Sequence, residues 1–397
     1  MKRFFYTYGP AFFIVVIGAV FITVAILFLP NLFKVHYLVV ETASLSLASS
    51  TPKIPVFVPS YIATPESVKG IYMTSWVAGT PPLRNVLVKL IDETEINSVV
   101  IDIKDYSGKI VFSVADNPTL KAFGSEEVRV KDMQSFIEEL HKKGIYVIGR
   151  IAVFQDAYFV KFKPNLAVKN KAGDAVWKDR KGISWIDAGS TEYWDYIVML
   201  TKESRKIGFD EINFDYIRFP SDGNMKDISF PFSSTTPKSI VLKNFFEYLS
   251  TNLQGTGLKT SADLFGMVTT AQDDMGIGQL LENALPYFDY ISPMVYPSHY
   301  PDTFEGFAKP EAHPYEVVHY AMQSAVKRAE LLASTTGKSI PDYNNKLRPW
   351  LQDFGLGMTY GPTEVKAQIK ATNDVGLDSW LLWSASNKYT KGALQAE

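Results

Sequence analysis

The sequence predicts a (β/α)8 TIM barrel preceded by one N-terminal transmembrane helix. Two observations carry this prediction. Short apolar segments alternate with helical patterns from residue 68 to the end of the chain, which is typical of βαβ units and a parallel sheet. The turn after the first of these segments, residues 76–82, lacks the Gly-rich fingerprint of a doubly wound nucleotide-binding sheet. A closed barrel is therefore favoured over an open sheet.

The amino terminus carries the membrane prediction. Residues 11–29 are apolar and uncharged, which is long enough for one helical span, and Lys2 and Arg3 precede them. We expect a cytoplasmic segment at 1–10, an anchor at 11–30, a Ser-, Thr- and Pro-containing linker at 31–66, and an extracytoplasmic domain at 67–397. A cleaved signal peptide is the alternative, since residues 42–44 and 47–49 offer small side chains for late cleavage.

Eight strand segments follow from runs of β-branched and aromatic residues. They are expected at 69–75, 97–104, 145–153, 210–216, 259–265, 290–296, 347–354 and 379–384. Helical periodicity fills most intervals, at 83–94, 130–143, 191–207, 237–253, 315–334 and 363–373. Gly144 and Gly208 follow directly after two of these helices, where a left-handed residue commonly ends a helix.

The fourth strand segment is unusual because its polar residues alternate with apolar ones. Glu211, Asn213 and Asp215 share one predicted face, and Ile212, Phe214 and Tyr216 share the other. A purely structural interior strand avoids unpaired charge, because burying it is costly. The strand ends before Pro220, so Asp215 is predicted at its carboxyl end, where TIM barrels mount catalytic side chains.

Polar and aromatic residues recur at the carboxyl ends of the other strands. The predicted substrate-binding set is Asp102, Lys104, Arg150, Tyr216, Arg218, Trp76, Tyr296, Gln352, Asp353 and Trp383. Aromatic faces pack on the C–H surfaces of sugars, and charged groups bind their hydroxyls. A carbohydrate cleft is therefore expected at this end of the barrel. Trp177 and Trp185 either line further sugar subsites or pack down the loop after the third strand.

Asp215 and Asp263 are the predicted catalytic pair, because glycoside cleavage needs two carboxyl groups flanking the bond. Asp215 is expected to act as nucleophile or electrostatic stabiliser, kept ionised by the nearby Arg218. Asp263 lies in an apolar run, and desolvation there would suit a proton donor. A structural partnership of Asp263 with Lys104 or Arg150 is the alternative.

The run Phe-Asp-Glu-Ile-Asn-Phe-Asp-Tyr-Ile-Arg-Phe-Pro at residues 209–220, with residues 68–72, 348–354 and 380–384, resembles the DUF4015 glycosyl hydrolase family. The resemblance covers nearly the whole chain after the linker. It implies a (β/α)8 fold and a role on extracellular polysaccharide. It also relates the chain to amylase-like barrels, whose nucleophile is an Asp ending strand four, as Asp215 does. Their acid is usually a Glu on strand five, where this chain has Asp263.

Composition excludes several other classes of function. The chain has no cysteine, so disulfides, thiolate metal sites and a cysteine nucleophile are ruled out. The net charge is −2 without a basic stripe, so no nucleic-acid partner is expected. No metal or cofactor is expected either. The partners predicted are a polysaccharide substrate and a membrane bound through the N-terminal helix. Two alternatives remain, a barrel that binds glycan without cleaving it and a structural envelope protein.

Overall fold

A computed structural model of the chain describes residues 57–396. The predicted anchor at residues 11–30 and most of the predicted linker lie outside this range. Across residues 57–396, none of the helices combines the length and the apolar composition that a membrane crossing requires.

Eight parallel strands close into a barrel in chain order, with the eighth strand paired to the first. The strands are β1 Lys69–Met73, β2 Ser98–Lys104, β3 Tyr146–Ala152, β4 Glu211–Asp215, β5 Lys259–Phe265, β6 Tyr290–Met294, β7 Trp350–Gln352 and β8 Trp380–Trp383. This topology confirms the predicted (β/α)8 barrel.

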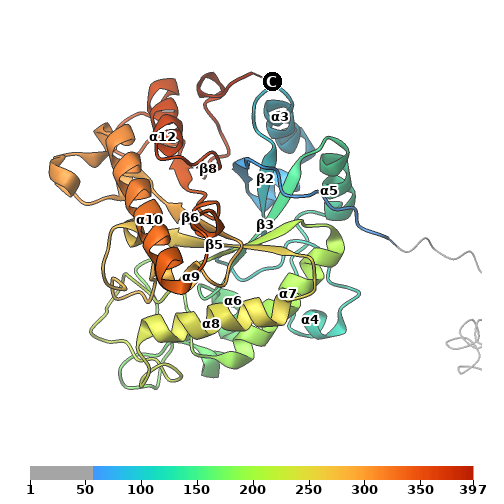
Figure 1. Cartoon of the computed structure of the whole chain (residues 1–397). Coiled ribbons are helices and arrows are strands. Elements are labelled where there is room, and N and C mark those ends of the chain that lie inside the picture. Colours follow the sequence, from blue (N-terminus) through green and yellow to red (C-terminus); the bar gives the residue numbers. More distant parts are fainter. Residues whose placement is uncertain (1–56, 397) are drawn as a thin grey trace, which may run out of the picture. The chain divides into compact units, whose positions relative to one another are not determined.

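Helices surround the barrel and cover the outer face of the sheet (Figure 1). The longer ones are α3 Pro81–Asp92, α5 Met133–Lys142, α7 Thr191–Ile207, α8 Lys238–Leu253, α10 Pro314–Thr336 and α12 Pro362–Asp374. Shorter helices lie in the connecting loops, at α2 Ser75–Ala78, α4 Pro118–Ala122, α6 Ala157–Phe162, α9 Leu281–Ala284 and α11 Ile340–Asn344. Six short 3-10 turns complete the connections in residues 57–396, at Pro164–Leu166, Gly266–Thr269, Pro297–His299, Phe304–Gly306, Pro310–Ala312 and Lys391–Ala393.

The sheet separates two apolar cores. Outward-facing strand residues such as Ile212 and Phe214 pack with the helices in the larger core. Inside the barrel, a smaller cluster contains Tyr72, Tyr146 and Trp350. The barrel interior is also polar, because Glu211 at the start of β4 is fully buried in an ion pair with Arg348. A buried charge of this kind is tolerated only when its partner is present.

The predicted boundaries of strands and helices agree best with the structure where the sequence periodicity is uninterrupted. β5 and α7 begin and end at the predicted residues. The seventh strand is shorter than predicted, because Pro349 has no N–H to donate to the ladder and Leu347 forms only an isolated bridge to Ile291.

The segment before β1 lies along the barrel. The backbone N–H of Ile62 donates to Asp210 Oδ1 at 2.8 Å, and the Tyr61 hydroxyl donates to the backbone oxygen of Arg205. Residues close to the predicted linker boundary are thus held by hydrogen bonds to the elements around β4.

Candidate active site

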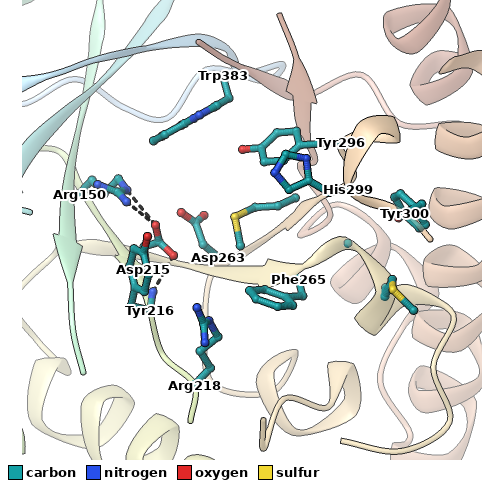
Figure 2. A pocket seen from close by; sticks show the side chains of 13 residues that line it. Arg150, Asp215, Tyr216, Arg218, Asp263, Phe265, Tyr296, His299, Tyr300 and Trp383 are labelled. Carbon is teal, nitrogen blue, oxygen red and sulfur yellow. Dashed lines mark hydrogen bonds and ion pairs between the residues drawn. The ribbon is translucent and has the colours of Figure 1, made fainter. Parts of the chain in front are cut away.

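A pocket with a volume of about 350 Å³ opens at the carboxyl end of the barrel strands (Figure 2). Its charged lining comes from β3, β4 and β5 and the loop after β4. The lining residues are Arg150, Asp215, Tyr216, Arg218, Asp263, Phe265, Gly266, Met267, Met294, Tyr296, His299, Tyr300 and Trp383. Seven of the twelve predicted site residues therefore share one pocket.

Asp215 ends β4 and is held from two sides. Arg150 on β3 donates to Asp215 Oδ2 from Nη2 at 2.5 Å and from Nε at 3.1 Å, while the backbone N–H of Tyr216 donates to Oδ1 at 2.6 Å. Tyr216 has φ +53°, a left-handed conformation that costs a non-glycine residue about 1–2 kcal/mol. This turn breaks the alternation of the strand, so Tyr216 joins the pocket lining instead of continuing the outer face. Such strain is typical of functional sites.

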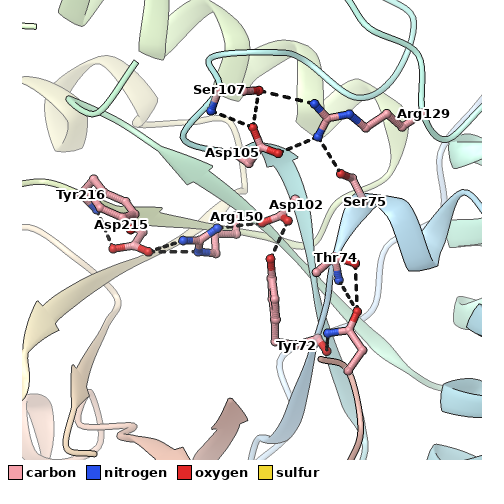
Figure 3. Close-up of polar contacts among 11 residues, drawn as sticks. Tyr72, Thr74, Ser75, Asp102, Asp105, Ser107, Arg129, Arg150, Asp215 and Tyr216 are labelled. Carbon is pink, nitrogen blue, oxygen red and sulfur yellow. Dashed lines mark hydrogen bonds and ion pairs between the residues drawn. The ribbon is translucent and has the colours of Figure 1, made fainter. Parts of the chain in front are cut away.

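A chain of hydrogen bonds fixes Arg150 (Figure 3). Its Nη1 donates to Asp102 Oδ1 at 2.8 Å, and the Tyr72 hydroxyl donates to Asp102 Oδ2 at 2.6 Å. Tyr72 in turn stacks on Trp383, with ring centroids 4.1 Å apart. The guanidinium thus bridges two carboxylates and lies 5.3 Å from the Trp383 ring centroid. Arg150, not the predicted Arg218, is the ion-pair partner of Asp215.

Asp263 on β5 has a different environment. It is 2 % exposed, and both hydrogen bonds that it accepts, from Asn213 Nδ2 and Trp350 Nε1, go to Oδ1 at 2.8 Å. Oδ2 has no hydrogen-bond partner in the described part of the chain, and the carboxyl group points into the pocket (Figure 2). Burial, reinforced by the negative charge of Asp215, raises the pKa of Asp263 to about 8. Asp263 is therefore protonated at neutral pH, and neither Lys104 nor Arg150 bonds to it.

Five predicted site residues lie outside the pocket lining. Asp102 is behind Arg150 and reaches the site only through it. Lys104 is fully buried, and its Nζ donates to Asp156 and Tyr193, because a register shift between Asp102 and Lys104 breaks the alternation of β2.

The other three residues have structural contacts. Trp76 is 62 % exposed and stacks with Arg129 at 4.5 Å. Gln352 and Asp353 follow one another at the end of β7, where Gln352 accepts from the backbone N–H and hydroxyl of Ser298 and Asp353 accepts from Thr390.

Several lining residues were not predicted, although the sequence carried a signal for some. Phe265 and Met294 follow inward-facing positions of β5 and β6 by two residues, so period two places them on the inner face. Gly266 is required by close approach, since a Cβ there would lie 2.4 Å from the Met294 backbone oxygen. Tyr300 and His299 come from the loop after β6 and carried no such pattern.

The two tryptophans of the loop after β3 pack that loop down. Trp185 is fully buried and donates from Nε1 to Asp179, and Trp177 donates to the backbone oxygen of Asn224. Neither lines the pocket. Between residues 57 and 396, no group of three or more histidine, aspartate or glutamate side chains is arranged to hold a metal ion.

Two solved structures are similar to this chain. The chain is 33 % identical to a hypothetical protein from Ruminiclostridium thermocellum of known crystal structure, over 48 % of this chain and 96 % of that one, with a TM-score of 0.44. The glycoside hydrolase domain of PgaB (BpsB) from Bordetella bronchiseptica superposes with a TM-score of 0.50 over 81 % of this chain and 94 % of that one. Its identity is 13 %, so the likeness concerns the fold. No curated protein sequence matches the chain.

A match to a protein-family model assigns the chain to a family. The family DUF4015, described as "Putative glycosyl hydrolase domain", matches residues 70–389, which span the barrel from β1 to the loop after β8. The chain therefore belongs to the DUF4015 family.

Proposed function

We propose that the protein is a glycoside hydrolase that cleaves an extracellular or cell-surface polysaccharide, with Asp215 and Asp263 as its two catalytic carboxyl groups. The observation that carries the proposal is the contrast between these side chains within one pocket. Asp215 accepts two bonds from a guanidinium, whereas Asp263 is buried with a proton at neutral pH and an unoccupied Oδ2. A carboxylate held by a cation beside a buried carboxyl group with a raised pKa is the arrangement that acid-assisted glycoside cleavage requires.

Asp263 is assigned as the general acid. The leaving sugar oxygen develops negative charge as the glycosidic bond breaks, and a proton on Asp263 Oδ2 neutralises it. Because Asn213 and Trp350 both bond to Oδ1, they orient the carboxyl group and leave Oδ2 toward the substrate.

Asp215 is assigned the second catalytic role, at the anomeric carbon of the sugar. There it acts as a nucleophile, or it activates a water molecule and stabilises the positive charge that forms on the sugar ring. Arg150 fixes the carboxylate through two bonds to Oδ2, so the orientation of Asp215 is set before substrate binds. The anomeric configuration of the first product distinguishes the two roles.

The aromatic walls suit a sugar ring. Trp383, Tyr296 and Phe265 surround the two carboxyl groups (Figure 2) and offer faces on which the C–H surfaces of a pyranose can pack. The pocket volume of about 350 Å³ lies within the usual range of small-ligand sites, so the pocket has room for a sugar residue.

The test is release of new reducing ends from a panel of bacterial surface and matrix polysaccharides. We expect cleavage by the wild type and a loss of at least about a hundredfold in Asp215→Asn. Asp353→Asn is the matched control, because Asp353 is also a buried carboxyl group at a strand end but does not line the pocket. Equal activity in wild type and Asp215→Asn would refute the assignment. Binding without cleavage would instead indicate a non-catalytic glycan-binding barrel.

The site of action is part of the proposal. An anchor at residues 11–30 with Lys2 and Arg3 before it would hold the barrel outside the cytoplasm. Protease added to intact cells should then digest the barrel. Protection of the barrel until the cells are lysed would contradict this placement.

A further inference from the structure

Arg218 differs from the other buried arginines of residues 57–396. Each of Arg84, Arg150 and Arg348 forms an ion pair with at least one carboxylate. Arg218 is only 8 % exposed, yet no carboxylate oxygen of a described residue lies within 4.0 Å of its guanidinium. Its charge therefore lacks the partner that burial normally demands.

The Arg218 side chain is nevertheless held in a fixed position. Its guanidinium carbon lies 4.8 Å from the ring centroid of Trp185, 5.4 Å from Tyr216 and 4.7 Å from Phe265. Nη1 donates to the backbone oxygen of Phe219 at 3.0 Å and to the Ser221 hydroxyl at 3.2 Å. Aromatic faces and one nitrogen thus immobilise the group before any ligand arrives.

The remaining edge of the guanidinium faces the pocket. Nε and Nη2 make no hydrogen bond to any residue in the described range, and Figure 2 shows the group directed into the pocket near Asp215. These two N–H groups are parallel donors, which is the fork geometry that binds both oxygens of a carboxylate.

Three acidic side chains act on Arg218 from beyond ion-pair distance: Asp215, the partly exposed Asp222, and Asp179. Two of them are already occupied. Asp215 accepts from Arg150, and Asp179 accepts from Trp185 and Gln155. Burial lowers the pKa of Arg218, and the negative charges of Asp215, Asp222 and Asp179 offset this effect only in part. A ligand anion in the pocket would supply the missing partner.

We propose that Arg218 binds a carboxylate carried by the sugar in the pocket, so that the substrate is an acidic polysaccharide containing uronate residues. The inference rests on the proposed function for its setting, because it names the substrate class of the same site. Recognition of the uronate by Arg218 requires only that the sugar binds, and does not require that it is cleaved. A neutral sugar would leave the Nε and Nη2 donors facing hydroxyl groups, which compensate a buried positive charge less well than a carboxylate does.

Matched ligands test this proposal without altering the protein. Binding of oligosaccharides of glucuronate and galacturonate to the full-length protein is compared by calorimetry with binding of their methyl esters and of the neutral glucose and galactose counterparts. We expect at least one uronate to bind about tenfold to a hundredfold more tightly than its methyl ester. Esterification removes the negative charge and the pair of equivalent carboxylate oxygens that the two N–H groups would bind. Sulfated neutral sugars form a further arm, and tighter binding of these than of uronates would overturn the carboxylate assignment.

Variants then assign the preference to Arg218. Arg218→Gln removes the charge and the fork and leaves a shorter polar side chain, so it should bring the affinities for uronate and ester to within about threefold of each other. Arg218→Lys keeps the charge but not the fork, so we expect an intermediate preference. Circular dichroism and thermal unfolding show whether each variant is folded.

The outcomes separate this inference from the proposed hydrolysis. Cleavage of neutral glycans with full activity in Arg218→Gln would overturn the uronate inference and leave the glycosidase standing. Arg218-dependent binding of uronates without cleavage would support the inference and contradict the hydrolysis. Equal affinity of the wild type for every uronate and its ester would overturn the inference by itself.

Discussion

Asp263→Asn should stabilise the protein, and the gain should grow with pH. In the native state the carboxyl group keeps its proton up to about pH 8, whereas in the unfolded chain it loses the proton near pH 4. Between these values the native state binds one proton more than the unfolded state. The free energy of unfolding therefore falls as pH rises through this window.

The magnitude follows from the linkage relation. One such group lowers the free energy of unfolding by about 1.4 kcal/mol for each pH unit, which amounts to about 5 kcal/mol at pH 8 as an order of magnitude. Asparagine carries no titratable proton, so the variant loses this slope. Its side-chain oxygen can still accept from Asn213 and Trp350, which bond to Oδ1 in the wild type.

Urea unfolding of both proteins at pH 5, 6, 7 and 8 measures the effect. We expect the free energies of unfolding of the two proteins to be closest at pH 5 and to differ more at each higher pH, with Asp263→Asn the more stable protein. Asp215→Asn provides an intermediate case, because the charge of Asp215 is the second cause of the raised pKa of Asp263. Parallel pH dependence in the wild type and Asp263→Asn, or a variant less stable than the wild type at pH 8, would refute the reasoning.

Two further predictions concern the buried ion pairs. Asp102→Asn removes one of the two carboxylates that hold Arg150, so steady-state kinetics should show kcat reduced by up to about a hundredfold with KM little changed; an unaltered kcat would contradict a positioning role. Glu211→Gln leaves the buried Arg348 without its charge partner, so urea unfolding should show a loss of about 3–5 kcal/mol. A loss below about 1 kcal/mol would mean that the pair contributes little.

The barrel was predictable because its signals are local. Alternating apolar and polar residues place Glu211, Asn213 and Asp215 on the inner face of β4, and the structure confirms this placement. Asn213 and Asp215 bond to partners on the neighbouring strands β5 and β3, and Glu211 bonds across the barrel to Arg348, which precedes β7. The carboxyl end of α7 was equally clear, because Gly208 follows it in the sequence. In the structure this glycine has φ +123°.

The partners within the site were not predictable from local pattern. Arg150 lies 65 residues before Asp215 in the sequence, and the pairing of β3 with β4 in one particular register brings the two together. Lys104 was expected in the site because we assumed that side chains alternate regularly between the two faces along β2. The register of β2 shifts after Asp102, so this alternation does not reach Lys104. Trp76 follows β1, but helix α2 begins at once and carries its side chain onto Arg129 instead of into the pocket.

The pH dependence of kcat/KM for polysaccharide cleavage tests the central claim most directly, because it reports the protonation state of the acid in the free enzyme. The claim that Asp263 donates the proton predicts a rate that declines above about pH 8 in the wild type. In Asp263→Asn, the residual rate should be at least about a hundredfold lower and should lack that decline. A wild-type rate that stays constant through pH 10, or an Asp263→Asn variant that retains both the rate and the decline, would contradict it.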